Sequence, residues 1–487
     1  MSTEDAEHQK PTPTGGPNTS KGGEADLKSG RGETSSTTDD KGSSGNERLM
    51  EEAFARDNAL KALKRVMQNK GSPGIDGMTV EEFPGWMRNN WTTVRAQLLD
   101  GTYRPKPVRL KEIPKGDGGV RKLGIPTLLD RFIQQCLLQV LQPAIDPTFS
   151  QHSYGFRPGR SAHDALEAAM GFIKAGYAWV VDVDIEKFFD HANHDVLMGR
   201  LIRRVADKRV LRLIRAYLNA GMMVDGVVVT SEEGTPQGSP LSPLLANVLL
   251  DDVDKELEKR GHAFVRYADD CNVYVHSEKA GLRVYEGMKK LLGKLRLRVN
   301  ETKSRVAPAT EPKFLGHRFE RKDSGEVILV VHPKALEKLR NTVRELTSRA
   351  AGLSMATVIA ALNVKLRGWR QYFRLVPAPR LVSQDEWIRR RLRALQLKQW
   401  KTPRRIEEQM RRAAIYERAA KAVVTHHRRY WAVATWPGMT LALRNSAFRT
   451  LGLYSLNVDI NPPNRRIRSR TSGGVGGGAA AAAPLSR

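Results

Sequence analysis

Apolar positions along the chain recur at spacings that change from one region to the next. Between residues 50 and 67 the apolar side chains lie three or four residues apart, which is the period of an amphipathic helix. A loop rich in glycine and proline, residues 71–77, ends this helix. The same pattern predicts later helices over residues 127–141, closed by Pro143, and over residues 161–175, 195–204, 208–219 and 243–259.

Strands interrupt these helices at three places. Residues 109–125 and 264–275 are each predicted to form a hairpin, because apolar and β-branched runs flank a short polar turn. Residues 180–185 alternate valine with aspartate and are predicted to form a single strand between them. This order predicts an α+β fold, with helices packed on one face of an antiparallel sheet.

After His332 the pattern becomes purely helical and strongly basic. Two amphipathic helices are predicted before residue 378, and a second helical unit spans about 380–455. Residues 1–47 contain almost no large apolar side chains, and residues 465–487 are basic and then rich in glycine and alanine. We expect both ends to be disordered, because they cannot bury enough apolar surface to fold.

Carboxylates gather on the predicted strands. Asp182 and Asp184 point to the same face of their strand, and Asp269 and Asp270 occupy the tip of the second hairpin. A lone Asp-Asp pair is usually a solvated turn, but aspartate is rare in strands, so two such places are unusual. Acids brought together there would repel one another unless a cation neutralised them. Oxygen ligands of this kind select Mg²⁺ or Mn²⁺, the metals used for phosphoryl transfer.

The charge of the chain indicates a polyanionic partner. The formal net charge is +27, yet residues 1–48 hold six Lys and Arg against nine Asp and Glu. The excess of positive charge therefore lies in the part that is expected to fold, which favours nucleic acid. A membrane surface is less favoured, because the basic residues are spread over many segments.

The cysteine count and the hydropathy exclude several protein classes. Cys136 and Cys271 stand far apart, so a disulfide framework or a cysteine-ligated zinc module is excluded. No apolar run approaches the roughly 18–20 residues that span a bilayer, and no signal-peptide pattern opens the chain. We expect a protein of a reducing, cytoplasmic setting with no membrane partner.

Seven motifs in order resemble the bacterial group II intron-encoded reverse transcriptases and maturases, without the HNH endonuclease domain. They cover residues 70–319 almost continuously, and Leu366 to Phe373, Gln399 to Pro403 and Tyr430 to Leu456 continue the likeness. The motifs are Lys70-Gly-Ser-Pro-Gly-Ile-Asp-Gly77, Ile113-Pro-Lys-Gly-Asp-Gly-Gly-Val-Arg-Lys-Leu-Gly-Ile-Pro126, Ser153-Tyr-Gly-Phe-Arg-Pro-Gly-Arg-Ser161, Asp184-Ile-Glu-Lys-Phe-Phe-Asp190, Gly234-Thr-Pro-Gln-Gly-Ser-Pro-Leu-Ser-Pro243, Tyr267-Ala-Asp-Asp270 and Phe314-Leu-Gly-His-Arg-Phe319.

The resemblance implies a right-hand polymerase fold followed by two helical domains. The implied divisions are a disordered tail (1–48), fingers and palm (49–330), a thumb (331–378), a maturase domain (379–460) and a second disordered tail (461–487).

The resemblance also implies the chemistry of the site. Asp184, Asp269 and Asp270 match the polymerase acids that hold Mg²⁺, with Mn²⁺ as a substitute, and Ile185 is a further expected ligand. Asp182 is less favoured, because the motif starts at Asp184. The implied reaction is attack of a primer 3′-oxygen on the α-phosphorus of an incoming dNTP.

Five residues match positions that contact the dNTP: Lys115, Arg121, Phe189, Gln237 and Lys303. Lysine and arginine suit the departing phosphates, although a generic basic hairpin would look the same. The phenylalanine would exclude a ribose 2′-hydroxyl, and its alternative role is packing in the core. Gln237 would lie against the template–dNTP pair, and Lys303 would lie near the primer end.

The implied partners are the group II intron RNA, the target DNA with its primer, and dNTPs. Arg389, Arg390, Arg404 and Arg405 are expected to contact nucleic acid, although such runs can be solvated helix faces. The tryptophans of the helical part are expected to lie mostly in the core.

Three functions stay open. The first is a polymerase that copies its intron and assists splicing; with no cysteine-supported nuclease, second-strand cleavage by this protein is not expected. The second is an RNA-binding splicing factor with an idle polymerase, which the three intact acids argue against. The third is a host-serving reverse transcriptase in DNA repair or phage defence.

Overall fold

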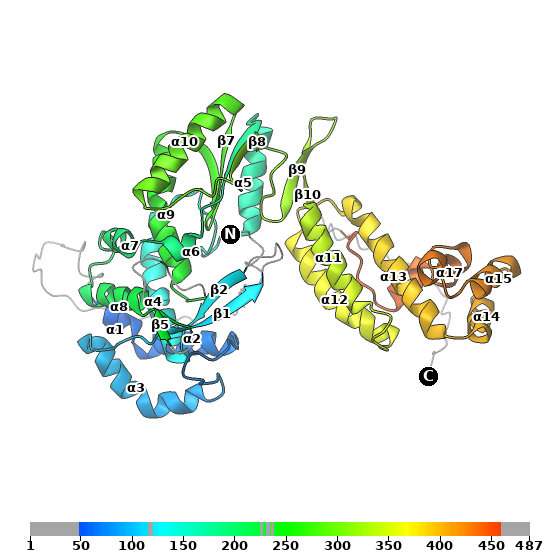
Figure 1. The fold of residues 1–487 in the computed structure, drawn as a ribbon, viewed down its shortest axis with the longest axis horizontal. Helices are drawn as coiled ribbons and strands as arrows, with labels where there is room; N and C mark the ends of the chain where they lie inside the picture. Colours follow the sequence, from blue (N-terminus) through cyan, green and yellow to red (C-terminus); the bar gives the residue numbers. More distant parts are fainter. Residues whose placement is uncertain (1–47, 115–119, 225–226, 230–233, 235–237, 459–487) are drawn as a thin grey trace, which may run out of the picture. The chain divides into compact units, whose positions relative to one another are not determined.

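A computed structural model describes residues 48–458, except 115–119, 225–226, 230–233 and 235–237. Contacts divide the chain into two compact units, Met1–His332 and Pro333–Arg487. Strands and helices mix in the described part of the first unit, whereas that of the second is helical (Figure 1). The prediction of an α+β fold followed by a helical region is confirmed.

The first unit contains both long helices and single turns. They are α1 (Leu49–Ala53), α2 (Arg56–Gln68), α3 (Phe83–Asp100), α4 (Leu128–Ile145), η3 (Asp146–Thr148), α5 (Ala162–Lys174), α6 (Phe188–His191), α7 (His194–Leu201), α8 (Lys208–Asn219), α9 (Ser242–Lys259) and α10 (Glu278–Lys294).

Polar caps set the start of several of these helices. The side-chain oxygen of the residue before the helix accepts a main-chain N–H from its first turn, which satisfies a donor that the helix itself leaves open. These capping residues are Thr127 for α4, Ser161 for α5, Asn193 for α7, Asp207 for α8 and Ser277 for α10.

Three predicted helix boundaries are wrong. The helix over residues 50–67 is two helices, because Ala55 is extended and the Phe54 ring turns inward against Trp91. Pro143 does not close α4 but lies within its last turn, where a missing N–H costs only one helical hydrogen bond. Helix α7 ends at Leu201, three residues before the predicted end.

The central sheet is antiparallel and carries the predicted acidic strands. Its order is β6 (Ala263–Tyr267), β7 (Asp270–Val275), β3 (Trp179–Val183) and β8 (Arg305–Pro308). The register places Asp182 opposite Asn272 on one side and opposite Arg305 on the other. The predicted strand and the second hairpin therefore lie side by side.

The described residues form two further sheets, one of four strands and one of two. One has the order β2 (Val120–Ile125), β1 (Val108–Pro114), β4 (Met222–Val224) and β5 (Val227–Val229), and includes the first predicted hairpin. The other pairs β9 (His317–Arg321) with β10 (Val327–Val331). The turn between β1 and β2, with Lys115, lies outside the described residues.

Helices cover both faces of the central sheet, so the prediction of helices on one face is wrong. On one face, a Cβ at Gly281 of α10 would meet Val306 of β8 at 2.5 Å and Val275 of β7 at 3.5 Å. On the other face, the Tyr274 ring lies 5.7 Å from the ring of Phe172 in α5. Side chains alternate along a strand, which is why neighbours on β7 meet different helices.

The second unit is built from helices over its described part. They are α11 (Pro333–Leu346), α12 (Met355–Tyr372), η4 (Ala378–Leu381), α13 (Val382–Trp400), α14 (Pro403–Arg412), α15 (Glu417–Thr425), α16 (Tyr430–Val433), α17 (Pro437–Ala442) and α18 (Asn445–Thr450). Leu397, Trp400, Ile406, Met410 and Val423 form part of one buried cluster.

Candidate active site

Asp184 lies one residue beyond the end of β3, and main-chain hydrogen bonds fix its backbone. Its N–H donates to Ser304 Oγ at 2.9 Å, and its carbonyl oxygen accepts from the Asn300 N–H at 2.8 Å. The next residue, Ile185, forms an isolated bridge with Val299 and is 3% exposed. Its apolar side chain is therefore buried, and only its main-chain oxygen could act as a metal ligand.

The Asp-Asp pair occupies the tip of the β6–β7 hairpin, as predicted. Tyr267 and Asp270 form the last strand pair, and Ala268 and Asp269 make the turn. Ala268 has φ +57°, in the left-handed region that favours glycine. This backbone conformation costs energy in a residue with a Cβ, so the surroundings must hold it.

The structure brings the predicted acids to the same end of the sheet. Asp270 precedes Asn272 by two residues, and Asn272 pairs with Asp182, so both carboxylates belong to one face. Asp184 follows Asp182 by two residues, just beyond the end of the same strand. Asp269 is next to them at the turn and is 8% exposed.

The acids perturb one another's protonation. Burial raises the pKa of Asp269, and the Asp184 carboxylate raises it further. Burial also raises the pKa of Asp270, with added repulsion from Asp182 and Asp269. For Asp182, burial and the charge of Asp184 raise the pKa to about 6, although the nearby Arg305 opposes this shift. These upward shifts mean that the carboxylates resist carrying their negative charges together.

This donor set suits a hard divalent cation. A cation among these carboxylates would relieve their repulsion, and their oxygens are the ligands that Mg²⁺ and Mn²⁺ prefer. Among the described residues, no three His, Cys, Asp or Glu side chains form a ready-made metal cluster.

Gly155 supports the hairpin tip from behind. A Cβ at this position would lie 2.2 Å from the Ala268 nitrogen and 2.9 Å from the Tyr267 carbonyl carbon. The Tyr154 N–H also donates to the Arg266 carbonyl oxygen at 2.9 Å. The motif from Ser153 to Ser161, to which the sequence assigned no chemistry, thus includes a glycine that lets two backbones touch.

A buried arginine holds the same turn from inside the sheet. Arg266 is 1% exposed and forms a two-pronged ion pair with Asp254 of α9, at 2.7 and 2.5 Å. Its Nη1 donates to the Ala268 carbonyl oxygen at 2.7 Å. The strained residue of the tip is therefore bonded to a side chain that is itself locked by a buried carboxylate.

The support continues to the segment that contains Gly155. Arg266 Nη1 also donates to Asn247 Oδ1 at 2.9 Å, and Asn247 Nδ2 donates to the Gly155 carbonyl oxygen at 2.9 Å. Arg266 Nη2 donates to Ser153 Oγ at 2.8 Å. One network thus joins α9, the Ser153 motif and the acidic tip. An arginine within an apolar strand was the signal for it, since a buried charge needs a partner.

The predicted dNTP-binding residues are only partly described. Lys115 and Gln237 lie outside the described residues, and Arg121 is in β2 opposite Ile113, with its side chain outside them. Lys303 is exposed in a turn in which the N–H of Lys303 donates to the Asn300 carbonyl oxygen at 3.2 Å. Because Asn300 binds the Asp184 backbone, this lysine lies close along the chain to the acidic site.

Phe189 belongs to the hydrophobic core as well as to the acidic motif. Its side chain is 7% exposed, and its ring meets the Phe188 ring edge to face at 5.1 Å. A Cβ at Gly234 would lie 3.2 Å from the Phe189 carbonyl oxygen, so the Gly234 motif passes closely behind it. Packing accounts for this burial, and only a small part of the ring could face a nucleotide.

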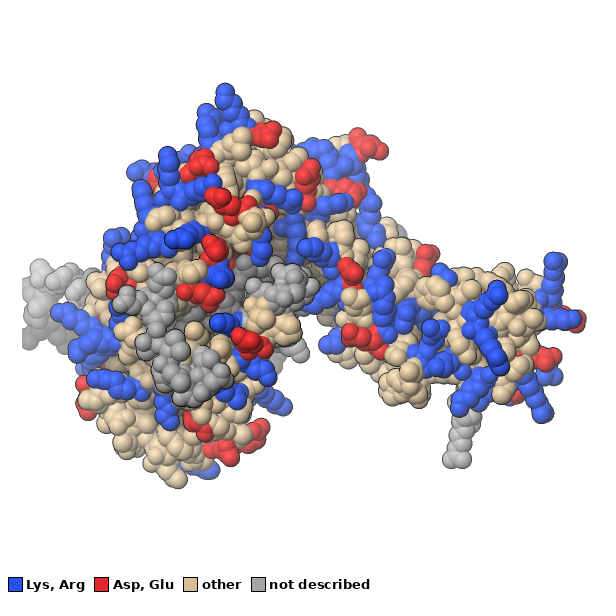
Figure 2. Space-filling view, in the orientation of Figure 1, with Lys and Arg blue, Asp and Glu red and all other residues tan. Residues whose placement is uncertain are grey.

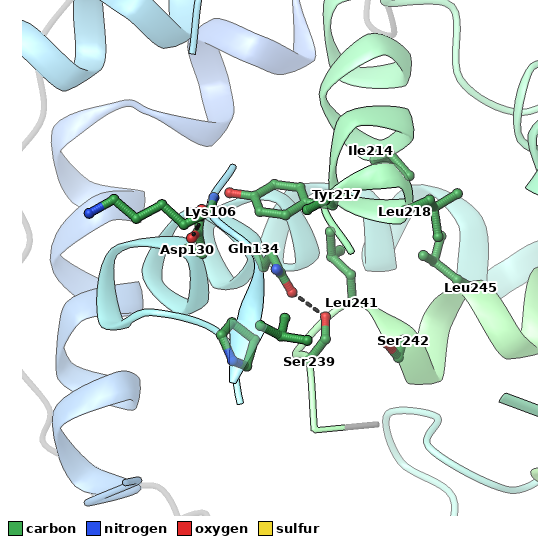
Figure 3. A pocket seen from close by; sticks show the side chains of 13 residues that line it. Lys106, Asp130, Gln134, Ile214, Tyr217, Leu218, Ser239, Leu241, Ser242 and Leu245 are labelled. Atoms are coloured by element: carbon green, nitrogen blue, oxygen red, sulfur yellow. Dashed lines mark hydrogen bonds between the residues drawn. The ribbon is translucent and has the colours of Figure 1, made fainter. Parts of the chain in front are cut away.

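A cavity of about 20 Å³ lies between α4, α8 and α9 (Figure 3). It has room for about one water molecule and is too small for a nucleotide. Asp130 accepts hydrogen bonds there from Thr127 at 2.6 Å and Tyr103 at 2.8 Å, and burial raises its pKa. Gln134 accepts a hydrogen bond from Ser239, which anchors the chain after Gln237 to α4. This cavity is therefore structural.

The second unit carries dense positive charge. Residues 333–458 hold 26 Lys and Arg against 7 Asp and Glu, and Figure 2 shows basic side chains spread over its visible surface. Arg404 and Arg405 are exposed on α14, Arg389 is half-buried, and Arg390 stacks on Trp431 with 3.9 Å between guanidinium and ring centre. Among the described helices, none is long and apolar enough to cross a membrane.

Two family profiles match this chain. Residues 113–319 match the family described as "Reverse transcriptase (RNA-dependent DNA polymerase)". Residues 336–416 match the family described as "Group II intron, maturase-specific domain". The first match includes the acidic site, and the second lies within the basic helical unit.

Individual proteins show the same likeness. "Protein YkfC" of Escherichia coli (strain K12) is 32% identical over 331 residues, which is 59% of this chain and 87% of that protein. "Group II intron-encoded protein LtrA" of Lactococcus lactis subsp. cremoris is 28% identical over 333 residues, 55% of each chain. The match thus spans about half of LtrA. A solved "Partial Cas6-RT-Cas1--Cas2 complex" shares 26% identity over 53% of this chain and 43% of its own, with a TM-score of 0.34.

Proposed function

The chain belongs to the family of bacterial group II intron-encoded reverse transcriptases and maturases, and we propose that it copies its own intron RNA into DNA and assists the splicing of that RNA. Its enzyme class is RNA-directed DNA polymerase. The observation that carries the polymerase is the convergence of Asp184, Asp269 and Asp270 at one end of the central sheet. Two distant segments supply these acids. A partly buried hydrogen bond holds the first segment, and a buried one holds the second.

Asp184, Asp269, Asp270 and the main-chain oxygen of Ile185 would hold Mg²⁺ or Mn²⁺, which when bound neutralises the charge that develops on the reacting phosphate. The chain's own contribution is position. Ser304 and Asn300 fix the first acid, and Arg266 with Gly155 fixes the tip that carries the other two.

The remaining predicted residues would bind the nucleotide. Lys115 and Arg121 would grip the triphosphate, as cations that stabilise the departing phosphates. Gln237 would lie against the template pair, Lys303 near the primer end, and the Phe189 ring against the ribose.

Splicing assistance would come from the basic helical unit. The intron RNA itself catalyses splicing, and a protein can stabilise its fold by contacts to phosphates and to single-stranded loops. The excess of positive charge over residues 333–458 supports this role, as does the maturase-domain match over residues 336–416. We place the thumb at 331–378 and the maturase domain at 379–460, with target DNA, primer and dNTPs as the other partners.

Primer extension on an RNA template tests the polymerase. With dNTPs and Mg²⁺, Asp184→Asn should lose activity about a thousandfold, because several kcal/mol of transition-state stabilisation depend on the cation. Asp195→Asn is the matched control, since this acid is 78% exposed and pairs with Arg215 on the surface. Equal activity of the two variants would refute the assignment.

A splicing assay tests the second role. Intron RNA should splice at a lower Mg²⁺ concentration with the protein present, and Asp184→Asn should keep this effect. Splicing assistance without any primer extension would favour the splicing-only factor, and primer extension without splicing assistance would favour a host-serving reverse transcriptase.

A further inference from the structure

A cavity in the second unit is lined by arginines and an exposed tryptophan. Its volume is about 150 Å³, and its walls are Thr347, Arg349, Arg391, Ala394 and Trp431. At about 15 Å³ for each water molecule, as in the smaller cavity, this space is large enough for a phosphate group with some of its hydration. Three segments meet there: the turn after α11, the middle of α13 and the start of α16.

Arg391 has a fixed position in the cavity wall. Its Nε donates to Thr347 Oγ1 at 2.7 Å, and its Nη2 donates to the Arg344 and Thr347 carbonyl oxygens at 3.2 and 3.4 Å. These contacts cap the C-terminal end of α11, which is a sufficient structural role for one arginine. These hydrogen bonds use Nε and Nη2 of Arg391, so the N–H groups on its Nη1 can donate to a bound ligand.

The surroundings of Arg391 are positive and unbalanced. Burial lowers its pKa, and the neighbouring Arg349 and Arg344 guanidiniums lower it further. Across the described part of the chain, neither these three arginines nor Arg390 forms a salt bridge with a carboxylate. Aromatic rings lie beside all four guanidiniums: Trp387 beside Arg344 and Arg391, Tyr430 beside Arg349, and Trp431 beside Arg390. These rings do not neutralise the positive charges, whereas an anion would relieve their repulsion.

The aromatic side chains of α16 complete the site. Trp431 is 38% exposed, and Arg390 stacks on its ring and donates to its carbonyl oxygen at 3.0 Å. Arg349 lies 5.5 Å from the centre of the Tyr430 ring. An exposed indole beside an arginine-lined cavity is the combination that binds single-stranded nucleic acid, in which unpaired bases can stack on rings.

We propose that this cavity is a subsite for one nucleotide of single-stranded RNA, with its phosphate between Arg349 and Arg391 and its base on Trp431. The proposal rests on the proposed function, because it assumes that the second unit binds RNA. It adds a fixed contact for an unpaired nucleotide to the general attraction of a basic surface. Of the four arginines that the sequence predicts to contact nucleic acid, Arg390 is the one that lines up with this site, because it stacks on Trp431.

Salt-dependent binding of a labelled single-stranded oligoadenylate to the full chain tests the phosphate contact. Arg349→Gln should reduce the slope of log affinity against log salt concentration by about 0.7, the value for one phosphate on a single strand. Arg412→Gln is the matched control, because this exposed arginine pairs with Glu408 at 2.5 Å. Equal slopes for the two variants would refute the phosphate contact.

Trp431→Ala tests the stacking contact. We expect a loss of affinity of about tenfold for the oligoadenylate with the salt slope kept, and little loss for an RNA duplex, whose bases are already stacked. Trp431→Phe should recover most of the affinity. A variant that merely disturbs the helices would instead lose thermal stability and bind both the oligoadenylate and the duplex more weakly. Equal losses for both probes with unchanged stability would overturn the subsite.

The subsite and the proposed function can fail separately. If wild type and all variants bind both RNAs with the same affinity, salt slope and stability, the subsite is wrong and RNA binding by the chain stands. If the wild-type chain binds neither RNA at low salt, the RNA-binding role of the second unit fails, and the subsite fails with it.

Discussion

Gly155→Ala is the sharpest test of how the acidic tip is supported. Gly155 lacks a positive φ, so alanine fits its backbone, and only the contact with the hairpin changes. The new Cβ would lie 2.2 Å from the Ala268 nitrogen, whereas real Cβ contacts essentially never fall below 3.0 Å. The Ala268 nitrogen is a backbone atom and the new Cβ is bonded directly to the backbone, so neither atom can rotate away. The hairpin tip must therefore move away from the Ser153 motif.

The size of this movement sets the expected effect. The gap must open from 2.2 Å to at least 3.0 Å, and Asp269 is the next residue along the turn. A misplacement of about 1 Å in a catalytic group can cost about 100-fold in rate. Overpacking of this kind costs about 1–3 kcal/mol in the free energy of unfolding. We expect a folded protein with a kcat about 100-fold lower and unchanged affinity for RNA.

Single-nucleotide incorporation on a primed RNA template measures this effect, with thermal unfolding measured in parallel. Gly171→Ala is the matched control, because a Cβ at this helical glycine of α5 meets nothing within 4 Å. It should keep full activity and gain about 0.4–1 kcal/mol of stability. If Gly155→Ala is as active as Gly171→Ala, the tip does not depend on this contact and the account of its support is wrong.

Three further outcomes follow from buried side chains. Arg266→Leu leaves the Asp254 carboxylate buried without its guanidinium, so urea denaturation should show a loss of about 3–5 kcal/mol; under about 1 kcal/mol would contradict a buried pair. Burial lowers the pKa of His317 to about 4, below its ordinary value of 6.5, so the unfolded state takes up the proton first and stability is lost as pH falls between these values. We expect a loss of about 2 kcal/mol from pH 7 to 5, which His317→Gln should remove. Phe189→Val should raise ribonucleotide incorporation relative to dNTP about tenfold if the ring meets the ribose; loss of stability alone would indicate core packing.

Local patterns were enough to predict the acidic strands. Asp182 and Asp184 alternate with valines, and Asp269 and Asp270 interrupt two apolar runs, so both features can be read within a few residues. Their proximity followed only from the resemblance and from the repulsion argument. The register of β3 against β7 now supplies the geometric reason.

The support of the tip could not be predicted from local patterns. Gly155 meets Ala268, and Arg266 meets Ser153, across more than a hundred residues. Such contacts depend on how segments pack, and neither periodicity nor turn chemistry reports it. Pro143 shows the same limit, because its effect depends on how near the helix end already lies.

Primer extension by Asp269→Asn/Asp270→Asn on an RNA template tests the central claim most directly. The two carboxylates at the hairpin tip are expected to be required, so wild type should make cDNA with dNTPs and Mg²⁺ while the double variant makes none. The variant should retain salt-dependent binding of RNA, because the basic helices of the second unit are untouched. cDNA synthesis by the variant at the wild-type rate would contradict the assignment of these acids.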